Sequence, residues 1–258
     1  MKPLITLTTD FGTRDGFVAQ MKGVILGINR EAELIDVTHD IHPFSVMEGA
    51  LVLKGVAPYF PSGTIHVVVV DPGVGSERRA IALRSEGRYY VGPDNGVFSL
   101  VMADVESTEA RGIENPSFMR PDPSATFHGR DLFAPVAAHL SLGARLDMIG
   151  PLLDDPVILS IPAVKELSSG IEGEVIHVDR FGNLVSNIEA SMLDRPVEKV
   201  TAGKVEMRGI STCFSEGKIG EPLALINSFG HLEIAVNQGD ASRVLDIGPG
   251  EQVTVLWA

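Results

Sequence analysis

The order of apolar and polar residues divides this chain into two parts of different character. In the first part, apolar runs of strand length at 4–9, 33–37 and 63–70 alternate with longer segments at 17–28 and 46–57. The longer segments carry apolar residues at every third or fourth position, as on one face of a helix. Strand, helix, strand, helix, strand is the order of a parallel sheet with right-handed crossovers.

The rest of the first part is less regular. Runs at 80–84 and 88–91 predict a pair of strands, 97–102 a short helix or strand, and 132–142 an apolar helix ended by Gly143. Residues 103–122 are polar and support no assignment. Asp15 and Asp131 precede the first and last of the predicted helices, and we expect each to cap the N-terminus that it precedes.

The second part follows a stretch at 151–170 that is interrupted by Pro151, Pro156 and Pro162 and serves as a predicted linker. Beyond it, short runs alternate with turn residues at 172–179, 199–205, 222–227, 231–236 and 252–257. No segment there has convincing helical periodicity, which is typical of a small barrel or sandwich. We therefore expect an α/β fold: a Rossmann-like three-layer domain with a parallel sheet at 1–160, then a smaller all-β, barrel-like domain at 161–258.

Composition narrows the class of protein. The chain has 258 residues and a formal net charge of −13, which argues against a nucleic-acid partner because phosphate contacts need clustered Lys and Arg. Its single cysteine, Cys213, has no internal partner for a disulfide. No secretory leader is recognisable, and no apolar run reaches the ~20 residues of a membrane helix. We expect a cytoplasmic protein without a membrane partner.

A group of charged residues follows the most apolar predicted strand, in the stretch VVVVDPGVGSERRA at 67–80. Asp71 stands where that strand ends, and Asp10 ends the first strand in the same way. Open α/β sheets bind ligands at this edge, and a carboxylate there can accept two hydrogen bonds from a ribose diol. A magnesium site is the rival use of these oxygens, and an ordinary turn is the alternative without function.

Several common catalytic motifs are absent from the sequence. Gly73 and Gly75 do not form a dinucleotide fingerprint, and the chain has no GxxxxGK[ST] loop, no GxSxG elbow and no HxxxH or HxH pair. His128 precedes the last predicted helix of the first part and could be purely structural. Asp71, Arg78 and His128 together could instead hold and polarise one water molecule.

Six phrases of the sequence, taken in order, resemble one known family. They are TTDFGTRDGFVAQMKGVI, VVDPGVGSERRAI, YVGPDNGVFS, TFHGRDLFAPVAAHL, VDRFGNLVSNI and INSFGHLEIAVNQG. The resemblance is to the S-adenosylmethionine (SAM) hydroxide adenosyltransferases, or adenosine-forming SAM hydrolases, which are relatives of the fluorinases and chlorinases. It spans both predicted domains.

The resemblance implies a reaction in which water displaces methionine from the ribose C5′ of SAM and forms adenosine. The family's catalytic Asp-Arg-His set falls on Asp71, Arg78 and His128, whereas the halogenating relatives carry tyrosines at the Asp and His positions. The fluorinase's longer loop insertion is also missing, so the resemblance favours hydrolysis. It implies no cofactor and no metal.

The family's substrate contacts fall on residues of both predicted domains. In the first domain they are Asp10 at the ribose hydroxyls, Asp15 as a second acid nearby, and Phe44 as an aromatic lining the site. In the second domain they are Asp179 and Asn183 near the methionine ammonium, Phe214 stacked on adenine, Ser228 at the methionine end, and Glu233, Val236 and Asn237 at the adenine edge. Phe229 stands where the halogenases have an arginine for the methionine carboxylate. The resemblance also implies a homotrimer with each site between two subunits.

Two other functions fit the same residues. A metal-dependent phosphoesterase would use Asp10, Asp15 and Asp71 as metal ligands. A nucleoside-binding sensor would keep the pocket without useful turnover.

Overall fold

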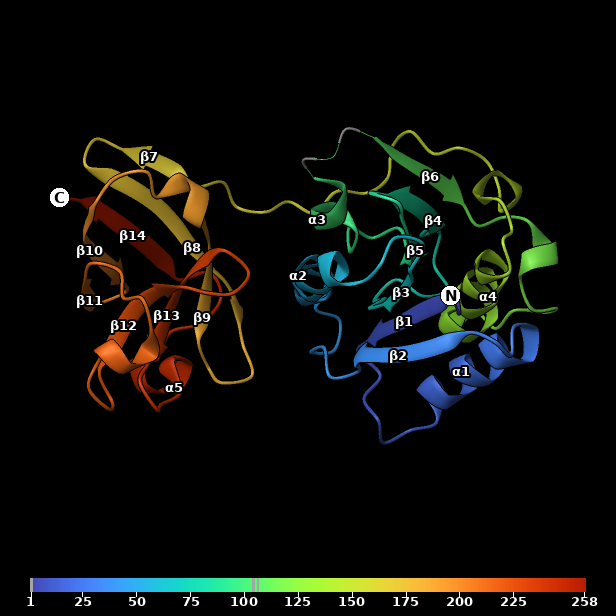
Figure 1. Cartoon of the computed structure of the whole chain (residues 1–258), viewed down its shortest axis with the longest axis horizontal. Coiled ribbons are helices and arrows are strands. Elements are labelled where there is room, and N and C mark those ends of the chain that lie inside the picture. Colours follow the sequence, from blue (N-terminus) through green and yellow to red (C-terminus); the bar gives the residue numbers. More distant parts are fainter. Residues whose placement is uncertain (1, 104, 106) are drawn as a thin grey trace. The chain divides into compact units, whose positions relative to one another are not determined.

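The computed structural model (Figure 1) describes residues 2–103, 105 and 107–258, which fall into two compact units. The first unit ends at Leu159 and the second begins at Ser160. Each unit has a hydrophobic core of its own, so each is described separately. None of the helices in the described residues is long and apolar enough to cross a membrane.

A mixed six-stranded sheet forms the centre of the first unit. Its elements in chain order are β1 (Leu4–Thr9), α1 (Phe17–Ile28), β2 (Glu33–Thr38), α2 (Val46–Val56), β3 (Ile65–Val69), β4 (Ala80–Ser85), β5 (Arg88–Pro93), α3 (Ser99–Met102), β6 (Thr108–Gly112) and α4 (Ala134–Ser141). The strand order is β2-β1-β3-β5-β4-β6. The first four of these strands are parallel, and β4 is antiparallel to both of its neighbours. The prediction of parallel strands in an α/β unit is confirmed.

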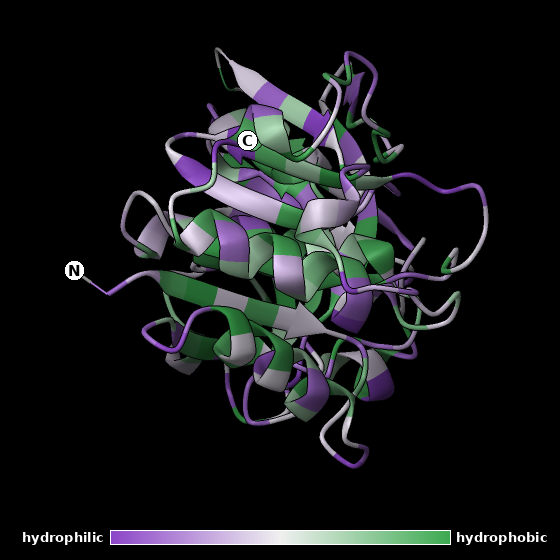
Figure 2. Cartoon of the chain, turned by 90° about the vertical axis from the view of Figure 1, so that its right-hand side faces the viewer, coloured by the Kyte–Doolittle hydropathy of each residue, from purple (hydrophilic) through white to green (hydrophobic). Residues whose placement is uncertain are grey.

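Residues on opposite faces of β3 belong to different hydrophobic clusters. Val67 and Val69 lie in a cluster with residues of α1 and α4, whereas Val68 lies in a cluster with residues of α2 and α3. Figure 2, which faces this unit, shows helices that carry both hydrophobic and hydrophilic residues, as expected for helices that cover a sheet. Because β3 is buried on both faces, its ends are where the chain can present polar groups to a ligand.

Both predicted helix caps, Asp15 and Asp131, are wrong. The cap of α1 is Gly16, without a side-chain hydrogen bond, so Asp15 lies one residue too early and stays exposed. Asp131 lies inside a π-helical turn (Gly129–Phe133) that precedes α4, and its carboxylate is drawn to the preceding loop, where it accepts a hydrogen bond from the Ser124 N–H. The turn also explains why α-helix begins only at Ala134.

The polar stretch at 103–122 contains a strand that the sequence pattern does not predict. This strand, β6, pairs with β4 through residues that include Ala110 and Gly112. Positions 104 and 106 lie outside the described residues. Residues 153–164, within the predicted linker, contain neither helix nor strand.

The second unit is a nearly closed, barrel-like antiparallel sheet. Its elements are β7 (Lys165–Leu167), β8 (Gly170–Val178), β9 (Leu184–Glu189), β10 (Val197–Ala202), β11 (Val205–Arg208), β12 (Pro222–Ile226), β13 (His231–Val236), α5 (Ala241–Leu245) and β14 (Gln252–Trp257). The order is β11-β10-β14-β8-β9-β13-β12, with β7 paired to β8 outside this path. The two end strands, β11 and β12, contact each other. The prediction of an all-β second part is confirmed.

Three details of the second unit differ from the sequence prediction. The run at 199–205 is divided between two strands, because Gly203 adopts a left-handed conformation with φ of +55° and turns the chain. Strand β9 was not predicted, since its buried face includes a polar residue, Ser186, whose hydroxyl donates to the Leu232 carbonyl. The short helix α5 was also missed, although Asp240 caps it through the Arg243 N–H.

Candidate active site

Two carboxylates meet at the carboxyl edge of the parallel strands. Thr9 of β1 is paired with Val69 of β3, and Asp10 and Asp71 follow these residues closely along their strands. The pKa of Asp10 is raised, chiefly by burial and also by the negative charge of Asp71. The hydrogen bond that Asp10 accepts from the Phe44 N–H opposes this shift. The structure therefore brings together the two acids that the sequence places at strand ends.

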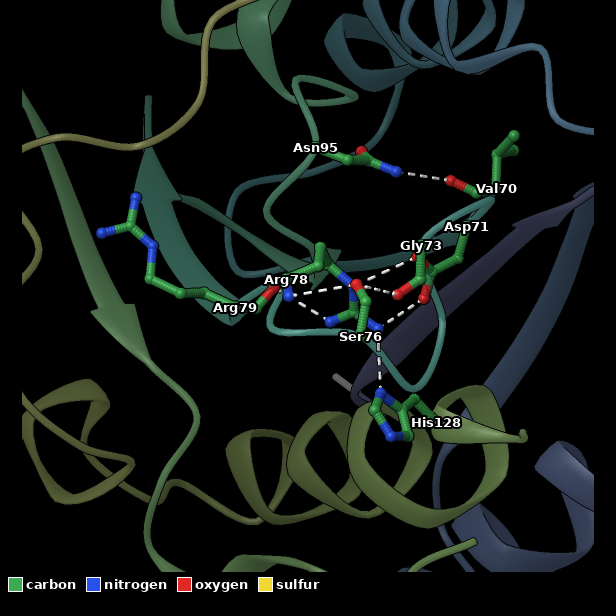
Figure 3. Close-up of polar contacts among 8 residues, drawn as sticks. All are labelled: Val70, Asp71, Gly73, Ser76, Arg78, Arg79, Asn95 and His128. Carbon is green, nitrogen blue, oxygen red and sulfur yellow. Dashed lines mark hydrogen bonds and ion pairs between the residues drawn. The ribbon is translucent and has the colours of Figure 1, made fainter. Parts of the chain in front are cut away.

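A tight turn returns Arg78 to Asp71. The Ser76 hydroxyl donates to the Gly73 carbonyl at 2.7 Å and accepts from the Arg78 N–H at 3.2 Å. The guanidinium then binds the carboxylate at two points, with Nε 3.1 Å from Oδ1 and Nη2 2.5 Å from Oδ2 (Figure 3). The exposed fractions of the two side chains are only 8% and 5%, for Arg78 and Asp71 respectively. A two-point pair of this kind is strongly oriented.

His128 completes a contiguous set of three side chains. Its Nδ1 lies 2.9 Å from Arg78 Nη2. A guanidinium carries only hydrogen-bond donors, so Nδ1 must accept, and the neutral ring therefore carries its proton on Nε2. Burial lowers the pKa of His128, and the adjacent Arg78 lowers it further, against the smaller opposing effects of Asp71 and Asp131. The structure thus favours a neutral imidazole with an Nε2–H donor.

Packing from both sides holds these groups in place. Phe133 meets the edge of the His128 ring at 6.5 Å between centroids, and the Arg78 guanidinium carbon lies 5.6 Å from the same Phe133 centroid. The turn that contains Gly75 also approaches the loop before His128 closely. A Cβ atom added to Gly75 would lie 2.3 Å from the Ala125 carbonyl oxygen, and φ at Gly75 is +78°. This position therefore requires glycine for two independent reasons.

Phe44 lies beside Asp10 in an unusual backbone conformation. Its φ is +69°, which is rare for a bulky residue, and its N–H donates to Asp10 Oδ2 at 2.9 Å. The residue as a whole is 69% exposed. The structure thus brings Phe44 to the first-unit site through its backbone and leaves the ring accessible. Asp15 does not share these contacts.

In the second unit, Asp179 and Asn183 form a rigid turn. Asp179 Oδ1 accepts from the N–H groups of Phe181 and Asn183 at 2.8 Å each, and Oδ2 accepts from Asn183 Nδ2 at 2.9 Å. Glu233 is buried nearby and accepts from Asn227 Nδ2 at 3.1 Å. The pKa of Glu233 is raised, chiefly by burial and also by the negative charge of Asp179. The hydrogen bond from Asn227 opposes this shift.

The remaining predicted residues of the second unit are Asn237, Phe214, Val236 and Ser228. Asn237 Nδ2 donates to the Gly217 carbonyl at 2.7 Å, which links it to the short helical turn that begins at the half-exposed Phe214. Val236 has its side chain in the barrel core, so only its backbone could meet a ligand. Ser228 follows Asn227 in the turn before β13. Asn227, which orients Glu233, was not singled out from the sequence, although it lies in the quoted phrase INSFGHLEIAVNQG.

The described residues offer no group of three or more His, Cys, Asp or Glu side chains arranged to hold a metal ion. Cys213 is a free, exposed thiol next to Phe214. In the first unit, Arg78 joins the Asp71 carboxylate to the His128 ring, and this set of polar side chains suits recognition of a small molecule.

Comparisons with known proteins found two matching family models and several related proteins. Residues 5–150 match the family model described as SAM hydroxide adenosyltransferase N-terminal domain, and residues 173–254 match the model of the corresponding C-terminal domain. An (R)-S-adenosyl-L-methionine hydrolase of Salinispora tropica is 40% identical over 256 residues, 98% of this chain and 97% of the relative. A fluorinase of an Actinoplanes species is 30% identical over 292 aligned positions, covering 99% of this chain and 98% of the relative.

The fold is also similar to a solved structure. The crystal structure of a conserved, uncharacterized protein from Thermotoga maritima superimposes with a TM-score of 0.90 at 39% identity, covering 98% of this chain and 99% of the other.

Proposed function

Because this chain belongs to the SAM hydroxide adenosyltransferase family, we propose that it hydrolyses S-adenosyl-L-methionine to adenosine and L-methionine. Relatives named (R)-S-adenosyl-L-methionine hydrolase, 37–40% identical over nearly the whole chain, support this reaction. The observation that carries it is the contiguous Asp71–Arg78–His128 set, in which Arg78 Nη2 contacts both the Asp71 carboxylate and His128 Nδ1.

In this reaction an oxygen of water bonds to C5′ while the C5′–S bond breaks and its electron pair stays on sulfur. The leaving group is a neutral thioether, so it needs no general acid. His128 Nε2–H donates to the attacking oxygen, the positive charge of Arg78 favours the hydroxide form of that oxygen, and the proton of the water passes to solvent. Asp71 orients Arg78 and offsets the repulsion between its charge and the sulfonium.

The substrate is held by residues from both units. Asp10 receives the ribose hydroxyls, and the exposed ring of Phe44 lies beside them. Asp15 serves as the second acid of this region. Asp179, Asn183 and Ser228 receive the methionine end, and Phe214, Glu233, Val236 and Asn237 receive the adenine.

The family resemblance further suggests how the protein is organised. We propose a Rossmann-like arrangement of the first unit, a homotrimer with active sites between subunits, and a cytoplasmic location. The residues of the two units would then meet on neighbouring subunits.

Incubation of the EDTA-treated protein with SAM in isotopically labelled water tests the reaction. We expect adenosine and methionine, with the label in the adenosine 5′-hydroxyl. Loss of activity with EDTA would favour a metal-dependent phosphoesterase. Tight adenosine binding without methionine release would favour a sensor.

A further inference from the structure

Arg78 and Arg79 are adjacent in sequence, but their side chains point in opposite directions (Figure 3). They lead into β4, where extended backbone sends successive side chains to opposite faces. Arg78 turns toward Asp71 and His128. Arg79 points away from His128 and binds a separate group of residues that the proposed chemistry does not use.

The partner of Arg79 is a buried carboxylate at the end of β5. Its Nε donates to Asp94 Oδ2 at 2.7 Å. The exposed fraction of the Asp94 side chain is 1%. A carboxylate so deeply buried is costly unless it is fully paired, so Arg79 and Asp94 depend on each other.

Asp94 also joins two backbone segments. Its Oδ1 accepts from the Val157 N–H at 2.7 Å, and its own N–H donates to the Arg79 carbonyl at 2.9 Å. The same Arg79 carbonyl accepts from Arg78 Nη1 at 2.9 Å. One carbonyl oxygen therefore links the guanidinium of Arg78 to the buried turn that Asp94 begins.

The chain that leaves the first unit is bound to the same turn. Arg79 donates to the side chain and the carbonyl of Asp155 at 2.7 and 2.6 Å, and the Leu159 N–H donates to the Ser99 hydroxyl at 2.7 Å. A Cβ atom on Gly96 would lie 2.7 Å from Leu159 Cγ, so residues 155–159 pack tightly here.

The turn reaches the catalytic edge of the sheet as well. Asn95 Nδ2 donates at 2.8 Å to the carbonyl of Val70, the residue before Asp71 (Figure 3). The turn of residues 94–96 therefore contacts the end of β3, the carbonyl that Arg78 uses, and segment 155–159.

We propose that Asp94 and Arg79 are positioning residues that hold Arg78 in its contact with Asp71 and His128. Neither touches the reacting atoms. The ion pair fixes the Arg79 backbone, and the fixed carbonyl limits where the Arg78 guanidinium can lie. The expected effect of these two residues on turnover rests on the proposed function.

The test is Asp94→Asn, which keeps the size of the side chain and removes its charge. With Arg79 released, we expect kcat to fall by about 10- to 10²-fold, the size of effect that a small misplacement of a catalytic group produces, with KM little changed. The His128 pKa, measured by NMR without substrate, should rise toward its ordinary value because Arg78 no longer lies against Nδ1. Asp155→Asn removes only an exposed partner of Arg79 and should change neither quantity.

The proposal would be overturned if the Asp94→Asn protein folds and both its kcat and its His128 pKa equal those of the unmodified protein. If Asp94→Asn does not fold, Arg79→Gln tests the same link, and Arg79→Lys should restore part of the loss by keeping one charge beside Asp94. The NMR measurement separates the two hypotheses. A shifted His128 pKa in a protein that never cleaves SAM would contradict the proposed function and leave the positioning role supported.

Discussion

Arg78 Nη2 lies 2.9 Å from His128 Nδ1, and this contact determines which nitrogen of the neutral ring carries the proton. Nδ1 is occupied as an acceptor, so Nε2 is the donor. The histidine therefore offers a hydrogen bond to an incoming oxygen and cannot take a proton from it unless the contact with Arg78 breaks. This relationship separates two roles for His128: donor to the attacking oxygen, or acceptor of its proton.

His128→Gln distinguishes those roles. A glutamine amide nitrogen can occupy the position of Nε2 and donate, but it cannot act as a base at neutral pH. We expect His128→Ala to lose about 10²–10³-fold in kcat, the cost of one preorganised donor, and His128→Gln to recover most of it. Turnover as low in the Gln variant as in the Ala variant, with adenosine binding intact in both, would instead indicate proton transfer to the ring.

Arg78→Lys should lower kcat by about 10²-fold or more. Lysine keeps the charge, but a single ammonium cannot reproduce the two-point contact with Asp71 and the contact with His128 together. Adenosine affinity, measured by calorimetry, should change little because Arg78 acts on the nucleophile. Arg145→Lys, which alters an exposed ion pair with Asp147, is the matched control and should retain full activity. Equal loss of adenosine affinity and turnover in Arg78→Lys would contradict the assignment.

Activity should fall as the pH drops below the pKa of His128. Burial and the Arg78 charge hold this pKa below its ordinary value of 6.5, while Asp71 and Asp131 oppose them. Protonation places a hydrogen on Nδ1 against the Arg78 donor, so the contact is lost in the acid form. An NMR titration of the ring, compared with the pH dependence of kcat/KM, checks this. Unchanged activity in a range where the ring is already protonated would show that the contact is dispensable.

Gly75→Ala should destabilise the first unit and impair turnover. The substitution places a Cβ against the Ala125 carbonyl and forces a left-handed backbone on alanine, which costs about 1–2 kcal/mol for the backbone alone. Gly143 has φ of +90° and open space around it, so Gly143→Ala carries the backbone cost without the clash. We expect a larger fall in Tm for Gly75→Ala, together with a loss of kcat absent from the control. Equal effects of the two substitutions would exclude a special role for the close approach.

His66 should make the first unit sensitive to acid. It is fully buried, its Nδ1 pairs with the Thr6 hydroxyl at 2.7 Å, its ring stacks on Tyr90, and Nε2 has no partner in the described residues. Burial, followed by the charge of Arg88, lowers its pKa from 6.5 to about 4.

The sign of the effect follows from that pKa. Between pH 4 and 6.5, approximately, His66 binds a proton in the unfolded chain but not in the folded chain. The contribution of neutral His66 to the free energy of unfolding is therefore complete above pH 6.5 and is lost as the pH falls toward about 4. At pH 5 the loss is about 2 kcal/mol. Urea unfolding at pH 5 and at neutral pH, repeated with His66→Gln, measures it: the difference between the two pH values should shrink in the variant.

Local patterns in the sequence were sufficient for the parallel strands β1, β2 and β3 and for the acids that follow β1 and β3. Four successive valines predict a strand covered on both faces, so Asp71 was expected where that strand ends. The Asp131 cap failed because its carboxylate is held by a loop and by neighbouring arginines, which are tertiary contacts. The pairing of Arg79 with Asp155 joins residues 76 positions apart, and no local spacing indicates it.

The opposite directions of Arg78 and Arg79 constrain the evolution of the turn between β3 and β4. Surface loops usually accept insertions and deletions with little penalty. Here the directions of the two arginines depend on their phase with β4, so the gain of one residue between Arg79 and Ala80 would send the anchoring side chain to the catalytic edge. Homologous chains that use this chemistry should therefore keep the length of this loop even where its composition varies.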